Sequence, residues 1–301
     1  MALTTDDQIE IDVRDDAAAL AHLLTLPVHA RLEALAEMQG ASTFDDVAMK
    51  RMRQVHESGD GFRISVDDPR YARGLQRLVE ADAWGQLRRD LARAWEYQRS
   101  ALPGIRHPDR IEVRLTLGNP DDPVFVEHTL GYYGMGATPG NIWLVAWPTD
   151  YNLTRIGACG VHELVHSLRT PNIETGFNLV EWIVHEGLAE VFTTEVCGRD
   201  STGAWYAEVT GSVLDATLET VTAAFDTGNG FRDWTPYVLG DLVAERIGVR
   251  PAGVPHMGGY AVGRLIVERY LAATGLRAAQ AIVLPASEIL SGAGIPARRP
   301  R

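Results

Sequence analysis

The spacing of apolar residues changes near residue 105 and divides the chain into two parts. Before that point, apolar positions recur every three to four residues, as in DAAALAHLL, HARLEALAEM and AWGQLRRDLARAWEYQRSAL. This spacing is typical of amphipathic helices, and glycines and prolines separate one run from the next. We therefore expect residues 1–104 to form a helical N-terminal segment that packs on the rest of the protein.

Beyond residue 105 the apolar positions alternate, which predicts strands at 110–117, 123–128 and 141–148. The stretch GYYGMGATPG, residues 131–140, contains four glycines and one proline. We interpret it either as a flexible hairpin connection or as a loop over a substrate cleft. In the second interpretation, an extended peptide pairs with an exposed edge of the strand at 141–147, beneath this loop.

Helical spacing returns after residue 155 and continues through most of the C-terminal part. The pattern predicts helices at 156–168, 179–196, 203–225 and 258–275. A small group of strands followed by many helices is typical of the α+β class. We expect one α+β domain over residues 105–294 and a frayed tail over residues 295–301.

The first of these helices carries the pattern His-Glu-x-x-His, formed by His162, Glu163 and His166. Residues four positions apart share one face of a helix, so the two imidazoles can bind one zinc ion from the same side. Glu163 lies about 100° around the helix from His162. Its carboxylate is therefore expected beside the metal, where it can accept a proton from zinc-bound water.

The second helix contains another His-Glu pair, His185 and Glu186, but in a different arrangement. Glu186 and Glu190 are four residues apart and share a face, whereas His185 points about 100° away from Glu186. Zinc accepts either a carboxylate oxygen or an imidazole nitrogen. The residues alone therefore leave Glu186 and His185 as candidates for the third metal ligand, and Glu190 as a surface carboxylate or a partner of a zinc-binding histidine.

The order of the motifs resembles known metallopeptidases. In gluzincins, a Glu on the next helix completes the zinc site, and an acidic residue one turn later often supports a zinc-binding histidine. HELVHSLR, EGLAEVF, GGYAVGRLIVERYL and LPASEILSG together resemble the predicted Zn-dependent proteases of the YjaZ type, over residues 105–292. The resemblance implies a zincin-like domain with a small antiparallel or mixed sheet. It also implies one zinc ion held by His162, His166 and Glu186, with Glu190 supporting a histidine.

His256 and Tyr260, in the stretch PHMGGYAVG, are candidates for stabilising negative charge on a substrate carbonyl oxygen. The paired glycines between them allow a close approach of the backbone to the site. Tyr260 is expected in the first turn of the helix, where its alternative role is that of an aromatic anchor in the core. The likeness to the YjaZ-type pattern favours Tyr260 over His256.

These residues predict a zinc-dependent peptidase that hydrolyses peptide bonds, with Glu163 as general base and a peptide or protein as substrate. Two other functions are consistent with the motifs. One is a zinc enzyme that acts on a small amide or another small molecule, and the other is a non-catalytic zinc-binding protein. The presence of Glu163 argues against the last, because zinc binding alone does not require it.

Composition and charge narrow the expected partners. The net charge is −12 and Lys50 is the only lysine, so nucleic acids and anionic membranes are not expected as partners. The acidic N-terminus lacks an apolar signal segment, and no apolar run is long enough to span a membrane, so a cytoplasmic location is expected. Of the two cysteines, Cys159 is expected to be a buried free thiol rather than a metal ligand.

Overall fold

A four-stranded sheet organises the structure, a computed structural model that describes residues 2–40, 45–173, 178–201, 203 and 206–296. Its strands, in spatial order, are β2 (Glu10–Val13), β4 (Arg110–Leu117), β6 (Asn141–Ala146) and β5 (Tyr132–Met135). β2, β4 and β6 are parallel, and β5 runs antiparallel to β6. The strands predicted at 110–117 and 141–148 are thus confirmed. A separate two-stranded pair joins β1 (Leu3–Thr4) to β3 (His107–Pro108).

The edge of the sheet differs from the one expected. The strand at 141–147 was predicted to offer an open edge, but β6 pairs with β4 on one side and with β5 on the other. That prediction is therefore wrong. On the β6 side of the sheet, the edge strand is β5, which lies inside the glycine-rich stretch 131–140. Glycines lower strand propensity, so the local sequence does not predict this strand.

The strand predicted at 123–128 is also absent, because Val124–His128 forms a short helical turn. Pro123 has helical backbone angles, and the Asp122 side chain accepts a hydrogen bond from the Phe125 amide at 3.1 Å. Only Phe125 of this turn is buried. The apparent alternation in PVFVEH was therefore too short to distinguish a strand from one helical turn.

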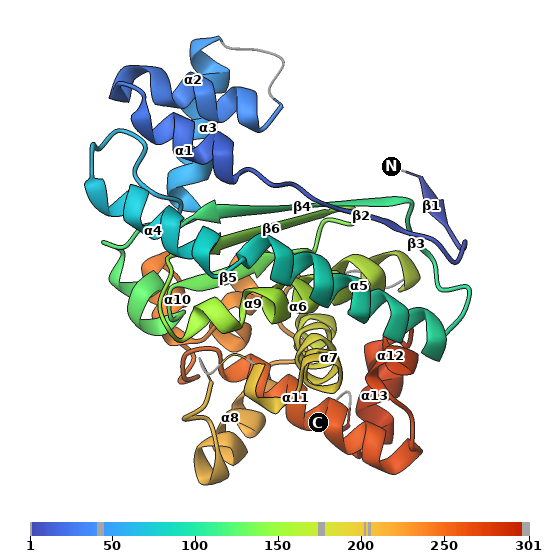
Figure 1. The fold of residues 1–301 in the computed structure, drawn as a ribbon. Helices are drawn as coiled ribbons and strands as arrows, with labels where there is room; N and C mark the ends of the chain where they lie inside the picture. Colours follow the sequence, from blue (N-terminus) through green and yellow to red (C-terminus); the bar gives the residue numbers. More distant parts are fainter. Residues whose placement is uncertain (1, 41–44, 174–177, 202, 204–205, 297–301) are drawn as a thin grey trace.

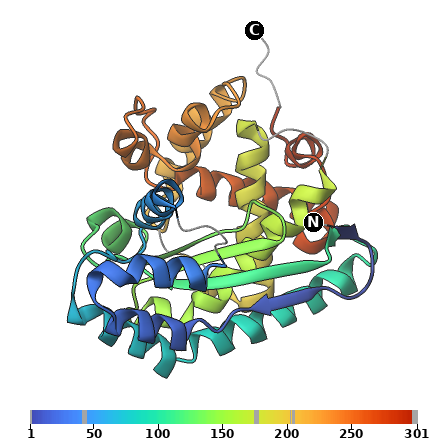
Figure 2. The ribbon, with the colours of Figure 1, turned by 90° about the horizontal axis from the view of Figure 1, so that it is seen from above.

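The N-terminal part is mainly helical, as predicted, but it also contributes β2 to the edge of the sheet (Figure 2). Its helices are α1 (Ala17–Thr25), α2 (Val28–Met38), α3 (Asp46–Ser58), α4 (Pro69–Glu80) and α5 (Ala83–Ala101). α5 packs against β2 and against the following helix of the C-terminal part. α5 thus packs against the helix that carries the His-Glu-x-x-His motif.

The C-terminal part is a set of helices stacked beneath the sheet (Figure 1). They are α6 (Ile156–Arg169), α7 (Leu179–Cys197), α8 (Gly211–Ala223), α9 (Phe231–Val238), α10 (Asp241–Arg246), α11 (Gly258–Thr274), α12 (Ala278–Ala281) and α13 (Ala286–Gly292). α6 packs against β5 and β6, and α7 packs against α6 and α11. The helix predicted at 203–225 begins only at Gly211, and residues 204 and 205 of that prediction lie outside the described residues.

α7 and α11 cross at two glycines. A Cβ atom on Gly187 would lie 2.2 Å from the carbonyl carbon of Gly263, and one on Gly263 would lie 2.1 Å from the Ile183 oxygen. Side chains at either position would overlap the opposite backbone, so the glycines permit this close crossing. The crossing brings the first turn of α11 to the buried face of α7.

The expected α+β class is confirmed by this combination of a small mixed sheet and many helices. A single large core connects the sheet with α5, α6, α7 and α11. Within the described residues, no helix is both long and apolar enough to cross a bilayer. Most of the tail predicted at 295–301 lies outside the described residues.

Candidate metal centre

α6 presents its two histidines from a helix that is buried on every side. All residues from Ile156 to Arg169 are buried, because α5, α7 and the sheet surround the helix. His162 and His166 lie one turn apart on the face toward α7, with ring centroids 4.8 Å apart. Burial of two imidazoles on one face requires polar partners in the neighbouring helix.

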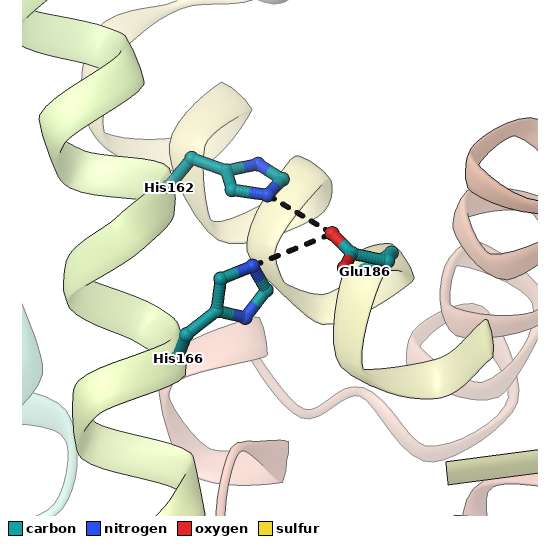
Figure 3. A group of neighbouring side chains, drawn as sticks. All are labelled: His162, His166 and Glu186. Atoms are coloured by element: carbon teal, nitrogen blue, oxygen red, sulfur yellow. Dashed lines mark hydrogen bonds and ion pairs between the residues drawn. The ribbon is translucent and has the colours of Figure 1, made fainter. Parts of the chain in front are cut away.

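α7 provides the partner. Its N-terminus is capped by Asn178, whose side-chain oxygen accepts a hydrogen bond from the Glu181 amide at 2.9 Å. Two turns later, Glu186 projects between the histidines (Figure 3). One carboxylate oxygen, Oε2, lies 3.1 Å from His162 Nε2 and 3.3 Å from His166 Nε2.

These two separations are close to those between ligand atoms in a zinc site. In tetrahedral coordination with ligand distances of about 2.05 Å, two ligand atoms lie about 3.3 Å apart. Among the described residues, the side chains that bring three metal-binding atoms together are His162, His166 and Glu186, all buried, with ligand atoms within 4.8 Å of one another. Two nitrogens and one carboxylate oxygen form a typical donor set for catalytic zinc.

The electrostatics of the cluster favour positive charge between these atoms. Burial alone would raise the pKa of Glu186, but the imidazoles of His166 and His162 outweigh burial and hold it well below its usual range. Burial would likewise lower the pKa of His162, but hydrogen bonds to Glu186 and Glu190 hold it well above its usual range. Metal ions bind to deprotonated ligands, so a cation would replace a proton here.

Glu163 lies beside this cluster and against the edge strand. Burial raises its pKa, and His166, His162 and the backbone of Gly136 partly offset this rise. A Cβ atom on Gly134 would lie 2.4 Å from Glu163 Cγ. β5 can therefore approach the carboxylate this closely only because it has glycine at position 134. The role of this glycine was not anticipated from the sequence.

His185 stacks on His166 and is not among the three residues whose ligand atoms converge. The two rings stack with centroids 4.0 Å apart, and the edge of Trp182 contacts His185 at a centroid distance of 5.4 Å. Burial and the neighbouring His166 lower the pKa of His185 well below its usual range. The arrangement thus gives Glu186, and not His185, the position facing both histidines of α6.

Tyr260 and His256 occupy different surroundings. The Tyr260 ring lies nearly parallel to that of His162, with centroids 6.1 Å apart. Burial and the carboxylates of Glu186 and Glu163 raise the Tyr260 pKa well above its usual range, so the phenol stays protonated. His256 instead contacts His128, with centroids 5.4 Å apart, and burial and His128 lower its pKa to about 4.

A small cavity of about 60 Å³ adjoins the cluster. Its walls include residues of β5, α6, α7 and α11, namely Tyr132, Gly134, Ala158, Cys159, His162, Glu163, Glu190, Thr193 and Tyr260. Cys159 is a free, buried thiol in this wall, as expected, and burial raises its pKa well above the usual range. Tyr260 lines the cavity, whereas His256 is absent from its lining.

Comparisons with known proteins identify a family of predicted zinc-dependent proteases. A family model described as "Predicted Zn-dependent protease (DUF2268)" matches residues 93–291. The chain is also similar to "Uncharacterized protein YjfC" of Bacillus subtilis (strain 168), with 32% identity over 177 residues. That match covers 58% of this chain and 59% of the relative, so the chain spans less than two thirds of YjfC. No solved structure matches the chain significantly.

Proposed function

This chain belongs to the family of predicted Zn-dependent proteases, and we propose that it is a zinc peptidase that hydrolyses peptide bonds. The observation that carries the proposal is the convergence of His162, His166 and Glu186 on one point beside Glu163. Three protein ligands leave one position of a tetrahedral ion open, as catalysis requires. One zinc ion per chain is therefore part of the proposal.

The chain's own side chains have separable roles. A bound zinc ion supplies Lewis acidity, which lowers the pKa of water and polarises a carbonyl group. Glu163 accepts a proton from the attacking water and transfers it to the leaving nitrogen. The Tyr260 hydroxyl donates a hydrogen bond to the carbonyl oxygen as negative charge develops on it.

The proposed binding mode of the peptide is pairing with β5. Within the described residues, β5 is the last strand of the sheet and has a neighbour only on the side of β6. An extended peptide added to such an edge gains main-chain hydrogen bonds. Because Gly134 lies against Glu163, a peptide on this edge passes close to the general base.

A small amide is the second candidate substrate, and one observation favours it. The cavity beside the cluster has a volume of only about 60 Å³, and the side chain of His162, the most exposed of the three metal-binding side chains, is 10% exposed. A small molecule enters such a site with less rearrangement than a polypeptide does.

The decisive experiment compares wild type, Glu163→Gln and the control Glu195→Gln, which alters an exposed glutamate of α7. All three are assayed for zinc content and for turnover of a peptide library and a panel of small amides. We expect Glu163→Gln to retain zinc and to lose at least about 10²-fold in turnover, whereas Glu195→Gln remains active. Wild-type turnover in Glu163→Gln would contradict the proposal, and cleavage of small amides alone would favour the second candidate.

A further inference from the structure

Glu190 is buried, with 2% of its surface exposed, and each of its two carboxylate oxygens has a polar partner. Oε1 lies 3.2 Å from His162 Nδ1, on the opposite side of that ring from Glu186. Oε2 accepts a hydrogen bond of 2.6 Å from the hydroxyl of Tyr206. Tyr206 belongs to the segment between α7 and α8 and is not part of any motif of the sequence.

Tyr206 is itself fixed by a cation. Arg264, on α11, donates a hydrogen bond from Nη1 to the Tyr206 oxygen at 3.2 Å, and its Nε donates to Glu268 at 2.9 Å. A guanidinium has only donors, so the phenol accepts from Arg264 and gives its own proton to Glu190. Burial and the Glu190 carboxylate raise the pKa of Tyr206 well above its usual range, which keeps that proton in place.

This chain of hydrogen bonds determines which nitrogen of His162 faces the cluster. With Nδ1–H directed at Glu190, Nε2 is the nitrogen that faces Glu186 and His166 and that would bind a metal. Carboxylates that fix the orientation and tautomer of a metal-binding histidine affect metal affinity about 10–100-fold. A donor on the second oxygen of Glu190 restricts rotation of this carboxylate.

We propose that Tyr206, supported by Arg264, is a positioning residue of the metal centre that raises its affinity for a divalent cation through Glu190 and His162. The inference rests on the metal centre of the proposed function. A purely structural role would attach the segment after α7 to α11 and would leave metal affinity unchanged. The two roles therefore predict different binding measurements.

The test measures the zinc dissociation constant by competition with a chromophoric chelator, for wild type, Tyr206→Phe, Glu190→Gln and the double variant. We expect Tyr206→Phe to weaken zinc binding about tenfold and Glu190→Gln to weaken it about 10–100-fold. Because Tyr206 acts through Glu190, the double variant should bind zinc like Glu190→Gln alone. Arg264→Met, which leaves Tyr206 in place, should weaken zinc binding in the same direction.

Tyr97→Phe is a matched control. The Tyr97 hydroxyl donates a hydrogen bond of 2.8 Å to Glu195, a glutamate of the same helix α7 that is not part of the cluster. Its removal should leave the zinc dissociation constant unchanged. The absorption spectrum of the cobalt-substituted protein gives a second readout, and it should change in Tyr206→Phe but not in Tyr97→Phe.

Wild-type zinc affinity in Tyr206→Phe would overturn the inference and leave the proposed function standing, even if the variant melted at a lower temperature. The inference would also be overturned if Tyr206→Phe weakened zinc binding as much in the Glu190→Gln background as in wild type, because the two residues would then act independently. A wild-type protein that binds no zinc would defeat the proposed function and this inference together.

Discussion

Replacing Arg169 by methionine should destabilise the protein through a buried ion pair that joins the two helices of the metal centre. Arg169 ends α6 and is 0% exposed. Its Nη2 donates to Glu181 of α7 at 2.8 Å, and its Nη1 donates to the carbonyl oxygens of Ile282 and Leu284, both at 2.8 Å. The variant removes these bonds and leaves the Glu181 carboxylate, whose side chain is 4% exposed, without its cation.

The expected loss follows from that geometry. Breaking a buried pair by removal of one partner costs about 3–5 kcal/mol. Unfolding entropy of about 2.1 cal/mol/K per residue gives about 0.6 kcal/mol/K for 301 residues. The melting temperature should therefore fall by about 5–8 °C.

The assay is thermal and urea unfolding in the presence of a chelator, so that metal binding does not contribute to the difference. Arg77→Met is the control, because Arg77 likewise bonds a carboxylate and the backbone, through one carbonyl oxygen rather than two, but its partner Asp150 is fully exposed. That control should lose less than about 1 kcal/mol. The double variant Arg169→Met/Glu181→Met should regain much of the loss. A loss below about 1 kcal/mol in Arg169→Met would refute the reasoning.

Three further predictions concern the metal, the oxyanion and pH. Wild type should contain about one zinc ion per chain, and His162→Ala and Glu186→Ala should lose it in elemental analysis; a full zinc load in both would disprove the ligand set. Tyr260→Phe should reduce turnover about 10²-fold or more with zinc content unchanged, whereas unchanged turnover together with inactive His256→Ala would transfer the role to His256. Burial lowers the pKa of His56 to about 4, despite its hydrogen bond to a backbone oxygen, from an unfolded value of 6.5. The neutral ring therefore contributes stability that is complete above pH 6.5 and is lost as the pH falls toward 4, about 3 kcal/mol in total. Unfolding free energies of wild type and His56→Gln between pH 4 and 7 should differ in slope, and parallel curves would disprove this linkage.

The parts of the site that depend on local geometry could be predicted from the sequence. The spacing of His162 and His166 places both on one helix face wherever that helix lies, and Asn178 is a cap that needs only its own helix. The choice of Glu186 over His185 as third metal ligand depended on the family resemblance. The residues of one helix do not show which of its faces turns toward a neighbouring helix.

The remaining features depend on contacts between distant segments. β2 and β5 are strands because each has a partner in the sheet, and neither alternates over a long enough stretch to indicate this alone. The need for glycine at position 134 follows from its distance to Glu163, which only the packed sheet defines. Tyr206 reaches Glu190 from a turn outside the helices and strands, where no periodicity could identify it.

Because of strand β2, the region that matches the family is shorter than the region that the sheet needs in order to fold. The family match begins at residue 93, inside α5, yet β4 receives its outer neighbour from residues 10–13. A protein shortened to the matched region would divide α5 and uncover the edge of β4, where Ile111 and Val113 are 0% exposed in the intact chain. An uncovered edge of this kind invites pairing between copies. Recombinant production of residues 93–291 alone should therefore yield aggregates, because β4 would lack the neighbour that residues 10–13 provide.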